Sequence, residues 1–383
     1  MAVNISTVVG LELTPMRLAV DYQANVSVLV VDTRREPDGT MRAVPLRMGF
    51  IQQFAPSGSV TAKWGSLGSG PGQFQGPEGI AVDRDGNVYV SDSLNRRVQK
   101  ISPFGTPLAQ WGLQGRGPGR VTTPWGVAVD NAGQVYVTDR GLHRVVILAP
   151  DGSIRAEWGV AGTGRGELQN PEGIAVDADR NVYVADTANH RIQVFSFDGV
   201  PLTQLGGRGS APGQFRAPSG VAVDRWGNVF VADTGNFRVQ KLSREGESAG
   251  IWGGERGPSG APNWLPADLA LDPAGNVHVA DALGRRILKL PTAVNPADQA
   301  RSRATAPPKA PSGPGKTAHE VLGIAPGASL ADVTSAYRKL ARQYHPDRVA
   351  DLGPEFSELA ERRMKEINAA YQLLRQHLSA QQS

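Results

Sequence analysis

Ten aspartates recur at regular spacing through the first three quarters of the chain, and carboxylates in such rows could bind metal ions or transfer protons. The first set is Asp83, Asp130, Asp177, Asp224 and Asp272, and the second set, nine residues later each time, is Asp92, Asp139, Asp186, Asp233 and Asp281. Five residues after each member of the second set comes an arginine: Arg97, Arg144, Arg191, Arg238 and Arg286. A reacting atom needs different groups around it, whereas these positions repeat identically. We therefore expect the first aspartate of each unit to satisfy a turn and the second to pair with its arginine.

A second group of reactive side chains lies near the C-terminus, where His345, Pro346 and Asp347 follow Tyr344. Proline fixes the local backbone, so an imidazole and a carboxylate are presented on a rigid segment. Arg338, Lys339 and Arg342 precede the segment at helical spacing. Such a basic helix face can steer docking onto an acidic partner surface.

Positions that differ between the repeated units are the remaining candidates for specific binding. They are Trp125, Trp226, Trp264, His143, His190 and His278, together with Arg34, Arg35, Arg42 and Arg47 in an insertion of the first unit. Taken singly, each is explained by packing or by a solvated surface. These residues do not assemble into an acid–base set, so we expect no catalytic residue, metal site or cofactor.

Composition excludes several classes of protein. The 383 residues include no cysteine, which rules out disulfides, thiol catalysis, iron–sulfur clusters and cysteine-based zinc sites. No apolar run is long enough to span a membrane, and residues 1–20 lack the pattern of a secretory signal. A cytoplasmic protein that does not engage membranes is therefore expected. The net charge is +4 overall and only +1 over residues 1–291, so a whole-domain basic surface for nucleic acid is missing.

The elements that must position these residues are short strands. Successive first-set aspartates are separated by 47, 47, 47 and 48 residues. Each unit contains four segments with period-two alternation, at 80–82, 88–90, 98–101 and 108–111 in the best copy, separated by Gly, Asn and Asp turn signals. A degenerate copy around Pro15 and Asp21, lengthened by an insertion near 36–48, makes six units. Six four-stranded units predict a six-bladed β-propeller over residues 1–291.

The ring should be closed by the N-terminus. The last unit ends at Leu290 without a fourth strand, and the segment 3–9 has the character of that missing strand. A Trp-Gly pair ends most units, at Trp64, Trp111, Trp158 and Trp252, with Leu205 in the same frame once. We expect these side chains to pack between blades.

The units resemble NHL repeats, a β-propeller family. The matching residues are Asn95-Arg96-Arg97-Val98, Asn189-His190-Arg191-Ile192 and Asn236-Phe237-Arg238-Val239, whereas Leu142 and Gly284 depart at the first position of the motif. The resemblance covers about three quarters of the chain, and it implies the same propeller fold. Relatives of this fold include lactonases and lyases, and some NHL propellers bind RNA.

After the repeats, residues 292–315 are rich in Pro, Ala and Ser and predict a solvated linker. Residues 316–383 then show helical spacing. Ser329 followed by Asp332 resembles a capping box at the start of one helix, which Pro346 ends. A second helix follows Gly353-Pro354, so the two predict an antiparallel hairpin with His345-Pro346-Asp347 in the connecting loop.

This small all-α module resembles the J domain of DnaJ-type co-chaperones. The matching segments are Glu320-Val321-Leu322-Gly323, Ala336-Tyr337-Arg338-Lys339-Leu340, Tyr344-His345-Pro346-Asp347-Arg348 and Lys365-Glu366-Ile367-Asn368. The resemblance implies that His345, Pro346, Asp347, Arg338, Lys339, Arg342 and Tyr344 engage a DnaK-type ATP-dependent chaperone and stimulate its ATPase. By this interpretation the chain is an activator of an enzyme and is not itself an enzyme.

Three functions follow from the two resemblances. In the leading one, the propeller recruits a specific protein client to the DnaK-type chaperone, because the Gly/Phe-rich segment and cysteine-based zinc domain of general DnaJ proteins are missing. The alternatives are a lactonase-like or lyase-like propeller enzyme and an RNA-binding propeller, each with the J domain as an accessory. The low charge of residues 1–291 disfavours RNA, and the arginines of the first unit keep it open.

Overall fold

The computed structural model describes residues 6–10, 14–31, 34–35, 41–42, 49–112, 121–254 and 260–290, and in the C-terminal part Leu322, Ala328, Ser329, Asp332, Val333 and Ala336. Contacts divide the chain into two compact units, Met1–Asn295 and Pro296–Ser383. The predicted linker at 292–315 and most of the predicted J domain at 316–383 lie outside the described residues. No helix among the described residues is long and apolar enough to cross a membrane.

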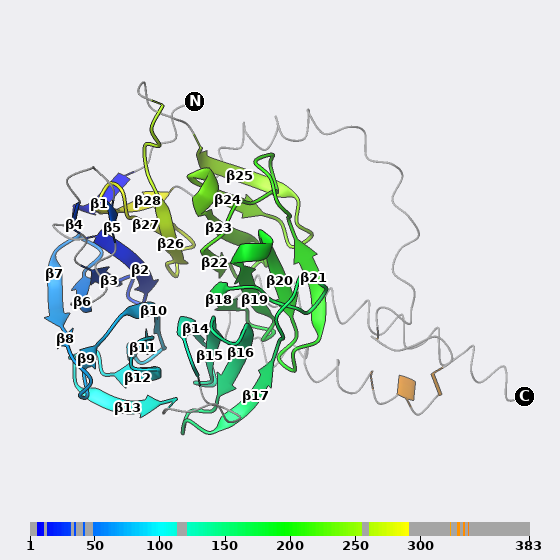
Figure 1. The fold of residues 1–383 in the computed structure, drawn as a ribbon, viewed down its shortest axis with the longest axis horizontal. Helices are drawn as coiled ribbons and strands as arrows, with labels where there is room; N and C mark the ends of the chain where they lie inside the picture. Colours follow the sequence, from blue (N-terminus) through cyan, green and yellow to red (C-terminus); the bar gives the residue numbers. More distant parts are fainter. Residues whose placement is uncertain are drawn as a thin grey trace, which may run out of the picture. The chain divides into compact units, whose positions relative to one another are not determined.

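The first unit is a six-bladed propeller, as the sequence predicts, with one four-stranded antiparallel sheet per blade (Figure 1). Blade 1 consists of β2 (Thr14–Val20), β3 (Val26–Val31), β6 (Gly49–Phe54) and β7 (Val60–Trp64). Blade 2 consists of β10 (Pro77–Val82), β11 (Val88–Asp92), β12 (Arg97–Ile101) and β13 (Pro107–Trp111). Blade 3 consists of β14 (Pro124–Val129), β15 (Val135–Asp139), β16 (Arg144–Leu148) and β17 (Ile154–Trp158).

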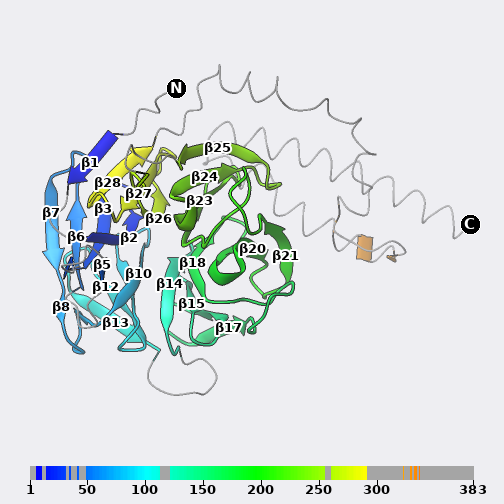
Figure 2. The same cartoon turned by 45° about the horizontal axis from the view of Figure 1, so that its top comes forward.

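The remaining blades repeat this order from the axis to the rim (Figure 2). Blade 4 consists of β18 (Pro171–Val176), β19 (Val182–Asp186), β20 (Arg191–Phe195) and β21 (Pro201–Leu205). Blade 5 consists of β22 (Gly220–Val223), β23 (Val229–Asp233), β24 (Arg238–Leu242) and β25 (Ser248–Gly253). Blade 6 consists of β26 (Pro266–Leu271), β27 (Val277–Asp281), β28 (Arg286–Leu290) and β1 (Ser6–Gly10).

The N-terminal strand closes the ring, which confirms the prediction from the sequence. β1 pairs antiparallel with β28, with Ser6 opposite Lys289 and Gly10 opposite Arg286. The first and last parts of the propeller therefore share one sheet, blue beside yellow in Figure 1. This closure removes the open sheet edge that a row of blades would otherwise leave.

Several loops contain additional short strands and turns. In blade 1 the insertion between β3 and β6 contains the small hairpin β4 (Arg34–Arg35) and β5 (Met41–Arg42). The link from blade 1 to blade 2 contains a parallel pair, β8 (Ser66–Leu67) and β9 (Gln73–Phe74). Two 3₁₀ turns, η1 (Thr187–Asn189) and η2 (Thr234–Asn236), join the second and third strands of blades 4 and 5.

The core lies between blades, because each sheet buries both faces against its neighbours. One cluster joins Leu205 of blade 4 to Phe215 and Val231, which belong to blade 5 and the link before it. Another joins Leu18 and Val28 of blade 1 to Ile287 of blade 6, across the closure. The tryptophans at the ends of the fourth strands pack in four further clusters of this kind: Trp64, Trp111, Trp158 and Trp252. The predicted packing role of these side chains is confirmed.

Candidate functional site

The repeated aspartates are structural, as their repetition predicts. In blade 2 the Asp83 side chain accepts hydrogen bonds from the backbone N–H groups of Asp85 (3.0 Å) and Asn87 (2.8 Å), which closes the turn between β10 and β11. Gly86 follows in this turn with a φ of 78°, a left-handed conformation that glycine adopts without strain. The Asp83 carboxylate therefore stabilises the turn in which it lies.

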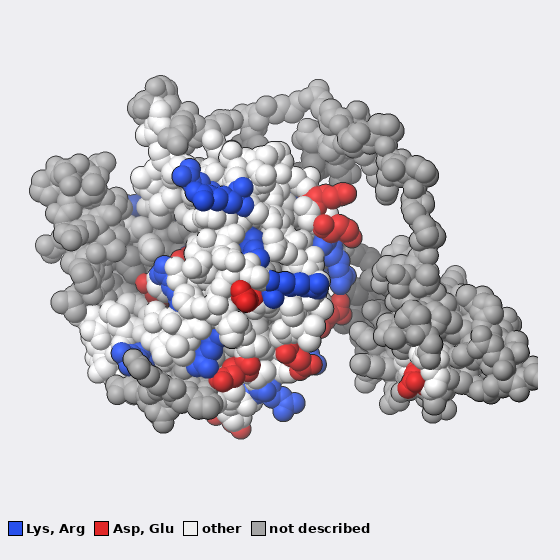
Figure 3. Space-filling view, turned by 45° about the vertical axis from the view of Figure 1, so that its right-hand side comes forward, with Lys and Arg blue, Asp and Glu red and all other residues white. Residues whose placement is uncertain are grey.

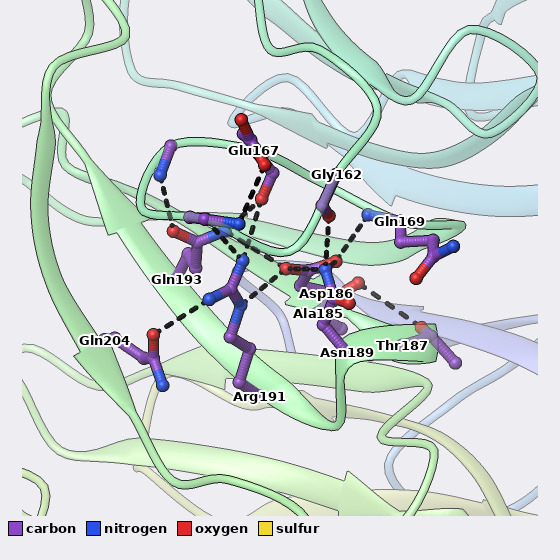
Figure 4. A network of polar contacts seen from close by, with 12 residues as sticks. Gly162, Glu167, Gln169, Ala185, Asp186, Thr187, Asn189, Arg191, Gln193 and Gln204 are labelled. Carbon is purple, nitrogen blue, oxygen red and sulfur yellow. Dashed lines mark hydrogen bonds and ion pairs between the residues drawn. The ribbon is translucent and has the colours of Figure 1, made fainter.

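The second aspartate of each unit holds a buried network, shown for blade 4 in Figure 4. The Asp186 carboxylate accepts hydrogen bonds from Arg191 Nε (2.7 Å), Gln193 Nε2 (3.0 Å) and Asn189 Nδ2 (2.9 Å). Arg191 Nη2 in turn donates to the carbonyls of Gly164 (2.7 Å) and Glu167 (2.9 Å) in the link between blades. The ion pair thus connects the link between blades to the strands of blade 4, where Arg191 Nη1 also donates to Gln204 Oε1 at 3.0 Å.

Equivalent pairs occur in the other repeats. The Nε-to-carboxylate distances are 2.8 Å for Arg97–Asp92, 2.7 Å for Arg238–Asp233, 2.9 Å for Arg286–Asp281 and 3.7 Å for Arg144–Asp139. In blade 3, Leu142 occupies the position of Asn189 in blade 4 and cannot donate a hydrogen bond to the aspartate. Asp139 instead accepts a hydrogen bond from Thr122 Oγ1 at 2.7 Å. The Asp–Arg pairing predicted from the sequence is confirmed, and these residues are not free for catalysis.

The histidine and tryptophan candidates lie apart from one another. The Nδ1 atoms of His143 and His190 accept backbone N–H bonds from Asn170 and Ala217, both at 3.0 Å. His278 is buried and lies 3.2 Å from the turn carboxylate of Asp272. Trp264 is buried and donates to the Phe237 carbonyl at 2.7 Å, whereas Trp226 is 58% exposed.

Three of the four arginine candidates of blade 1 belong to the strands of one small hairpin. Arg34 lies opposite Arg42, and Arg35 lies opposite Met41. Arg47 and the chaperone-binding candidates Arg338, Lys339, Arg342, Tyr344, His345, Pro346 and Asp347 lie outside the described residues.

Sequence reasoning missed a cluster of charged side chains at one end of the propeller axis. The innermost strands of blades 2 to 5 have a glycine two residues after a proline, at Gly79, Gly126, Gly173 and Gly220. A Cβ atom at Gly126 would overlap the Glu172 carbonyl oxygen of the next blade, so glycine allows the blades to approach. Blades 6 and 1 have Asp268 and Arg17 at this position. That departure from the repeat is the signal that could have identified the cluster.

Arg17 connects four blades from this position, and it is only 6% exposed. Its Nε donates to the Glu78 carbonyl at 2.8 Å, and its Nη1 donates to the Ala267 carbonyl at 2.6 Å. Its Nη2 lies 3.5 Å from Glu172 Oε2. The Asp268 side chain accepts the Leu18 N–H at 3.3 Å, which ties blade 6 to blade 1.

Burial changes the protonation of the carboxyl groups in this cluster. It raises the pKa of Glu78 to about 7 against the opposing charge of Arg17, and the nearby Glu172 adds to the rise. It raises the pKa of Asp268 to about 6 in the same way. The pKa of Glu172 is also raised by burial, although Arg17 and Arg140 oppose the change. Carboxyl groups with such values can exchange protons near neutral pH.

Two further side chains complete the cluster on blade 3. Arg140 lies 4.3 Å over the Trp125 ring and 3.8 Å from Glu172 Oε1.

A cavity of about 270 Å³ follows the axis between the innermost strands, with Arg17 and Asp268 at one end. A second cavity of about 340 Å³ lies at the other end, beside Tyr22 and Trp226. Among the described residues, no three His, Asp or Glu side chains are grouped so as to hold a metal ion.

The described part of the C-terminal unit shows how one helix begins. Ser329 Oγ accepts the Asp332 N–H at 3.2 Å, and Asp332 Oδ2 accepts the Ser329 N–H at 3.0 Å. The Val333 N–H then bonds to the Ser329 carbonyl at 3.0 Å, and the Val333 side chain is buried. The reciprocal cap predicted at Ser329 is confirmed.

Comparison with known proteins supports both units. A DnaJ domain model matches residues 317–382, and an NHL repeat model matches residues 74–101, 122–148, 168–195 and 215–242. The chaperone protein DnaJ of Fusobacterium nucleatum subsp. nucleatum is 47% identical over 64 residues, which are 17% of this chain and 16% of that protein. DnaJ of Clostridium tetani is 49% identical over 61 residues, 16% of this chain and 15% of that protein. The similarity thus spans about a sixth of these relatives.

Solved structures resemble the propeller in fold. A gluconolactonase from Xanthomonas campestris has a TM-score of 0.53 at 18% identity, covering 75% of this chain and 89% of that one. A streptogramin B lyase has a TM-score of 0.50 at 12% identity, covering 75% and 97%. At these identities the likeness shows the fold alone. Together, the repeats, the ring of six blades and the C-terminal match identify the chain as an NHL-repeat β-propeller protein with a C-terminal DnaJ domain.

Proposed function

We propose that this protein is a DnaJ-type co-chaperone, which stimulates the ATPase of a DnaK-type chaperone through residues 316–383. The observation that carries the proposal is the DnaJ match over 317–382, because it includes His345, Pro346 and Asp347 in sequence. The cap at Ser329 marks the start of a helix, and Arg338, Lys339 and Arg342 follow it in the sequence at helical spacing. Their charge would steer the domain toward an acidic surface, and Tyr344 precedes the loop that makes contact.

We further propose that the propeller recruits a particular protein client. The ten repeated aspartates and their arginines are used within the blades, so they form a scaffold and not a reactive centre. Client choice then depends on the side chains that differ between blades. With residues 292–315 as the linker, the propeller would hold the client and the J domain would bring the chaperone to it.

The test is ATP turnover by a purified DnaK-type chaperone with and without the full chain. We expect the wild-type chain to accelerate turnover and His345→Gln to abolish the acceleration. His377→Gln changes another histidine of the same module outside the loop and should behave as wild type. Equal stimulation by His345→Gln and wild type would refute the proposal.

The axial cluster supports a second candidate, a propeller that catalyses proton transfer. Asp268 lines the axial cavity together with Arg17, and the same arginine interacts with Glu78, whose pKa burial raises to about 7. An acid and a base at this end of the axis could act on one substrate. Hydrolysis of simple sugar lactones by the full chain, lost in Glu78→Gln, would support this candidate. A rate equal to that of the buffer would dismiss it for that substrate class.

A further inference from the structure

The topology of the blades places the loops on two opposite faces of the propeller. Successive strands in a blade are antiparallel, so the loops between first and second strands and between third and fourth strands lie at one end of the axis. The loops between second and third strands and the links between blades lie at the other end. We call the first end the aspartate face and the second end the arginine face.

Charge is sorted between these faces. The described loops of the arginine face contain one acidic residue, Glu167, and nine arginines: Arg34, Arg35, Arg42, Arg96, Arg140, Arg165, Arg208, Arg216 and Arg285. The described loops of the aspartate face contain four arginines, and twelve acidic residues: Asp21, Asp83, Asp85, Asp130, Asp151, Asp177, Asp179, Asp198, Asp224, Asp272, Glu245 and Glu247. The described loops are thus sorted by charge along the axis, although the net charge of residues 1–291 is only +1.

The arginines of the aspartate face are already engaged. Arg84 lies 5.7 Å over the Tyr22 ring, and Arg225 lies 4.3 Å over the Trp226 ring. The other two are Arg180, which lies 4.7 Å over the Phe197 ring, and Arg244, which lies 4.0 Å from an Asp179 oxygen. These contacts, together with the surrounding carboxylates, leave little positive potential at this end.

On the arginine face, three guanidinium groups remain available. Arg96, Arg208 and Arg216 are exposed, and within the described part of the chain their side chains make no hydrogen bond or ion pair. Burial and then the charges of Arg208 and Arg216 lower the pKa of the neighbouring His190, which reflects a positive potential there. Arginines without ion-pair partners on one face of the propeller can attract carboxylates or phosphates.

Exposed apolar side chains distinguish between those two ligands. On the arginine face they are aliphatic: Leu67, Leu94, Leu142, Val160 and Leu283, with exposed fractions from 41% to 62%. The exposed aromatic side chains of the described residues are Tyr22, Phe104 and Trp226, all on the aspartate face. Single-stranded nucleic acid stacks its bases on aromatic rings, and the described residues of this face expose none. Protein interfaces combine arginine with an apolar core, and this face exposes both.

We propose that the arginine face binds an acidic segment of a partner protein. Carboxylates of the segment pair with Arg96, Arg208 and Arg216, and its apolar side chains pack against Leu94 and Leu283. This deepens the proposed recruitment of a client, on which it rests, by naming the face and the chemistry of the client. On the side of the molecule seen in Figure 3, basic and acidic side chains form small groups with uncharged surface between many of them.

The test uses the full chain and a short fluorescein-labelled peptide rich in glutamate and leucine, followed by anisotropy. We expect binding that weakens with salt and falls about tenfold in the double variant Arg208→Glu with Arg216→Glu. The matched control, Arg84→Glu with Arg225→Glu on the aspartate face, should bind within about twofold of wild type. Unfolding curves of both variants keep folding defects separate from binding defects.

Two comparisons decide between ligands. A peptide with lysine in place of glutamate should not bind, and a single-stranded RNA of equal length should bind more weakly than the acidic peptide. No binding of the acidic peptide, equal loss in both double variants, or tighter binding of the RNA would overturn the proposal. Stimulation of the DnaK-type ATPase should be unchanged in Arg208→Glu with Arg216→Glu, so failure of this proposal and failure of the co-chaperone proposal give different results.

Discussion

The network around Asp186 and the cluster around Arg17 both bury an arginine against carboxylates, yet they differ in symmetry. Asp186 and Arg191 recur in other blades with nearly the same distances, and their hydrogen bonds stay within one blade and its link. Arg17 occurs once, in a place that glycine occupies in blades 2 to 5, and contacts three other blades. A feature repeated in five of the six blades builds the ring, and a departure from the repeat marks a position with its own role.

The largest effect is expected from breaking the repeated network. Asp186→Ala would leave the Arg191 guanidinium, 7% exposed, without its carboxylate, and should lower the free energy of unfolding by about 3–5 kcal/mol. Asp281→Ala should cost less, because its partner Arg286 is 38% exposed and can be solvated. Urea unfolding of both variants gives the comparison. Equal losses would show that burial of the arginine does not control the effect.

The axial cluster should make stability depend on pH. The folded protein holds the Glu78 proton up to a pKa of about 7, whereas the unfolded chain releases it near 4.5. The resulting stabilisation is therefore complete below pH 4.5 and is lost as pH rises through 7, by about 3 kcal/mol. In the Glu78→Gln variant, the free energy of unfolding should depend less on pH between 4.5 and 7. The exposed control Glu245→Gln should keep the pH dependence of the wild type. A wild-type profile that rises between pH 5 and 8 would contradict the assignment.

Close approach of the blades gives a prediction of intermediate size. Gly126→Ala places a methyl group against the Glu172 carbonyl of the next blade, so we expect a loss of about 1–3 kcal/mol. Gly207→Ala is the matched control, since a Cβ there has no atom within 4 Å, and it should be neutral or slightly stabilising. Thermal unfolding of the two variants would separate packing from glycine content, and a similar loss in both would argue against the packing explanation.

The smallest effect is expected at the cap of the C-terminal unit, a local feature independent of any repeat. Ser329→Ala removes the hydroxyl that accepts the Asp332 N–H and should destabilise this unit by about 1 kcal/mol. Ser329→Asp retains a capping oxygen and should recover most of the loss. Amide hydrogen exchange near Val333 reports on this helix directly. Unchanged exchange in Ser329→Ala would mean that the cap does not limit its stability.

The sequence was sufficient to predict the fold because the repeat is itself a structural unit. Aspartates at intervals of 47 and 48 residues located the blades, and the unit missing a fourth strand indicated that the N-terminus supplies it. The axial cluster could not be assembled in the same way. Arg17, Glu78, Glu172 and Asp268 are far apart in sequence, and only the closure of the ring brings them together.

The difference in charge between the two faces could not be read from the net charge for a related reason. A net charge of +1 over residues 1–291 is a sum over both faces, and a sum cannot show that the described loops of one face hold most of the arginines and those of the other most of the carboxylates. Strand direction decides the face of each loop. Counting charge by loop type, once four strands per unit are predicted, would have revealed the arginine face from the sequence.

In the proposed function, the propeller binds the partner and residues 316–383 activate the chaperone, so the two tasks belong to separate units. The most direct test is one reaction that contains a DnaK-type chaperone, ATP and the labelled acidic peptide, in which ATP turnover and anisotropy are both followed. We predict that His345→Gln loses the stimulated turnover and keeps the peptide, whereas Arg208→Glu with Arg216→Glu keeps the turnover and loses the peptide. Loss of both signals in either variant, or of neither, would contradict the account.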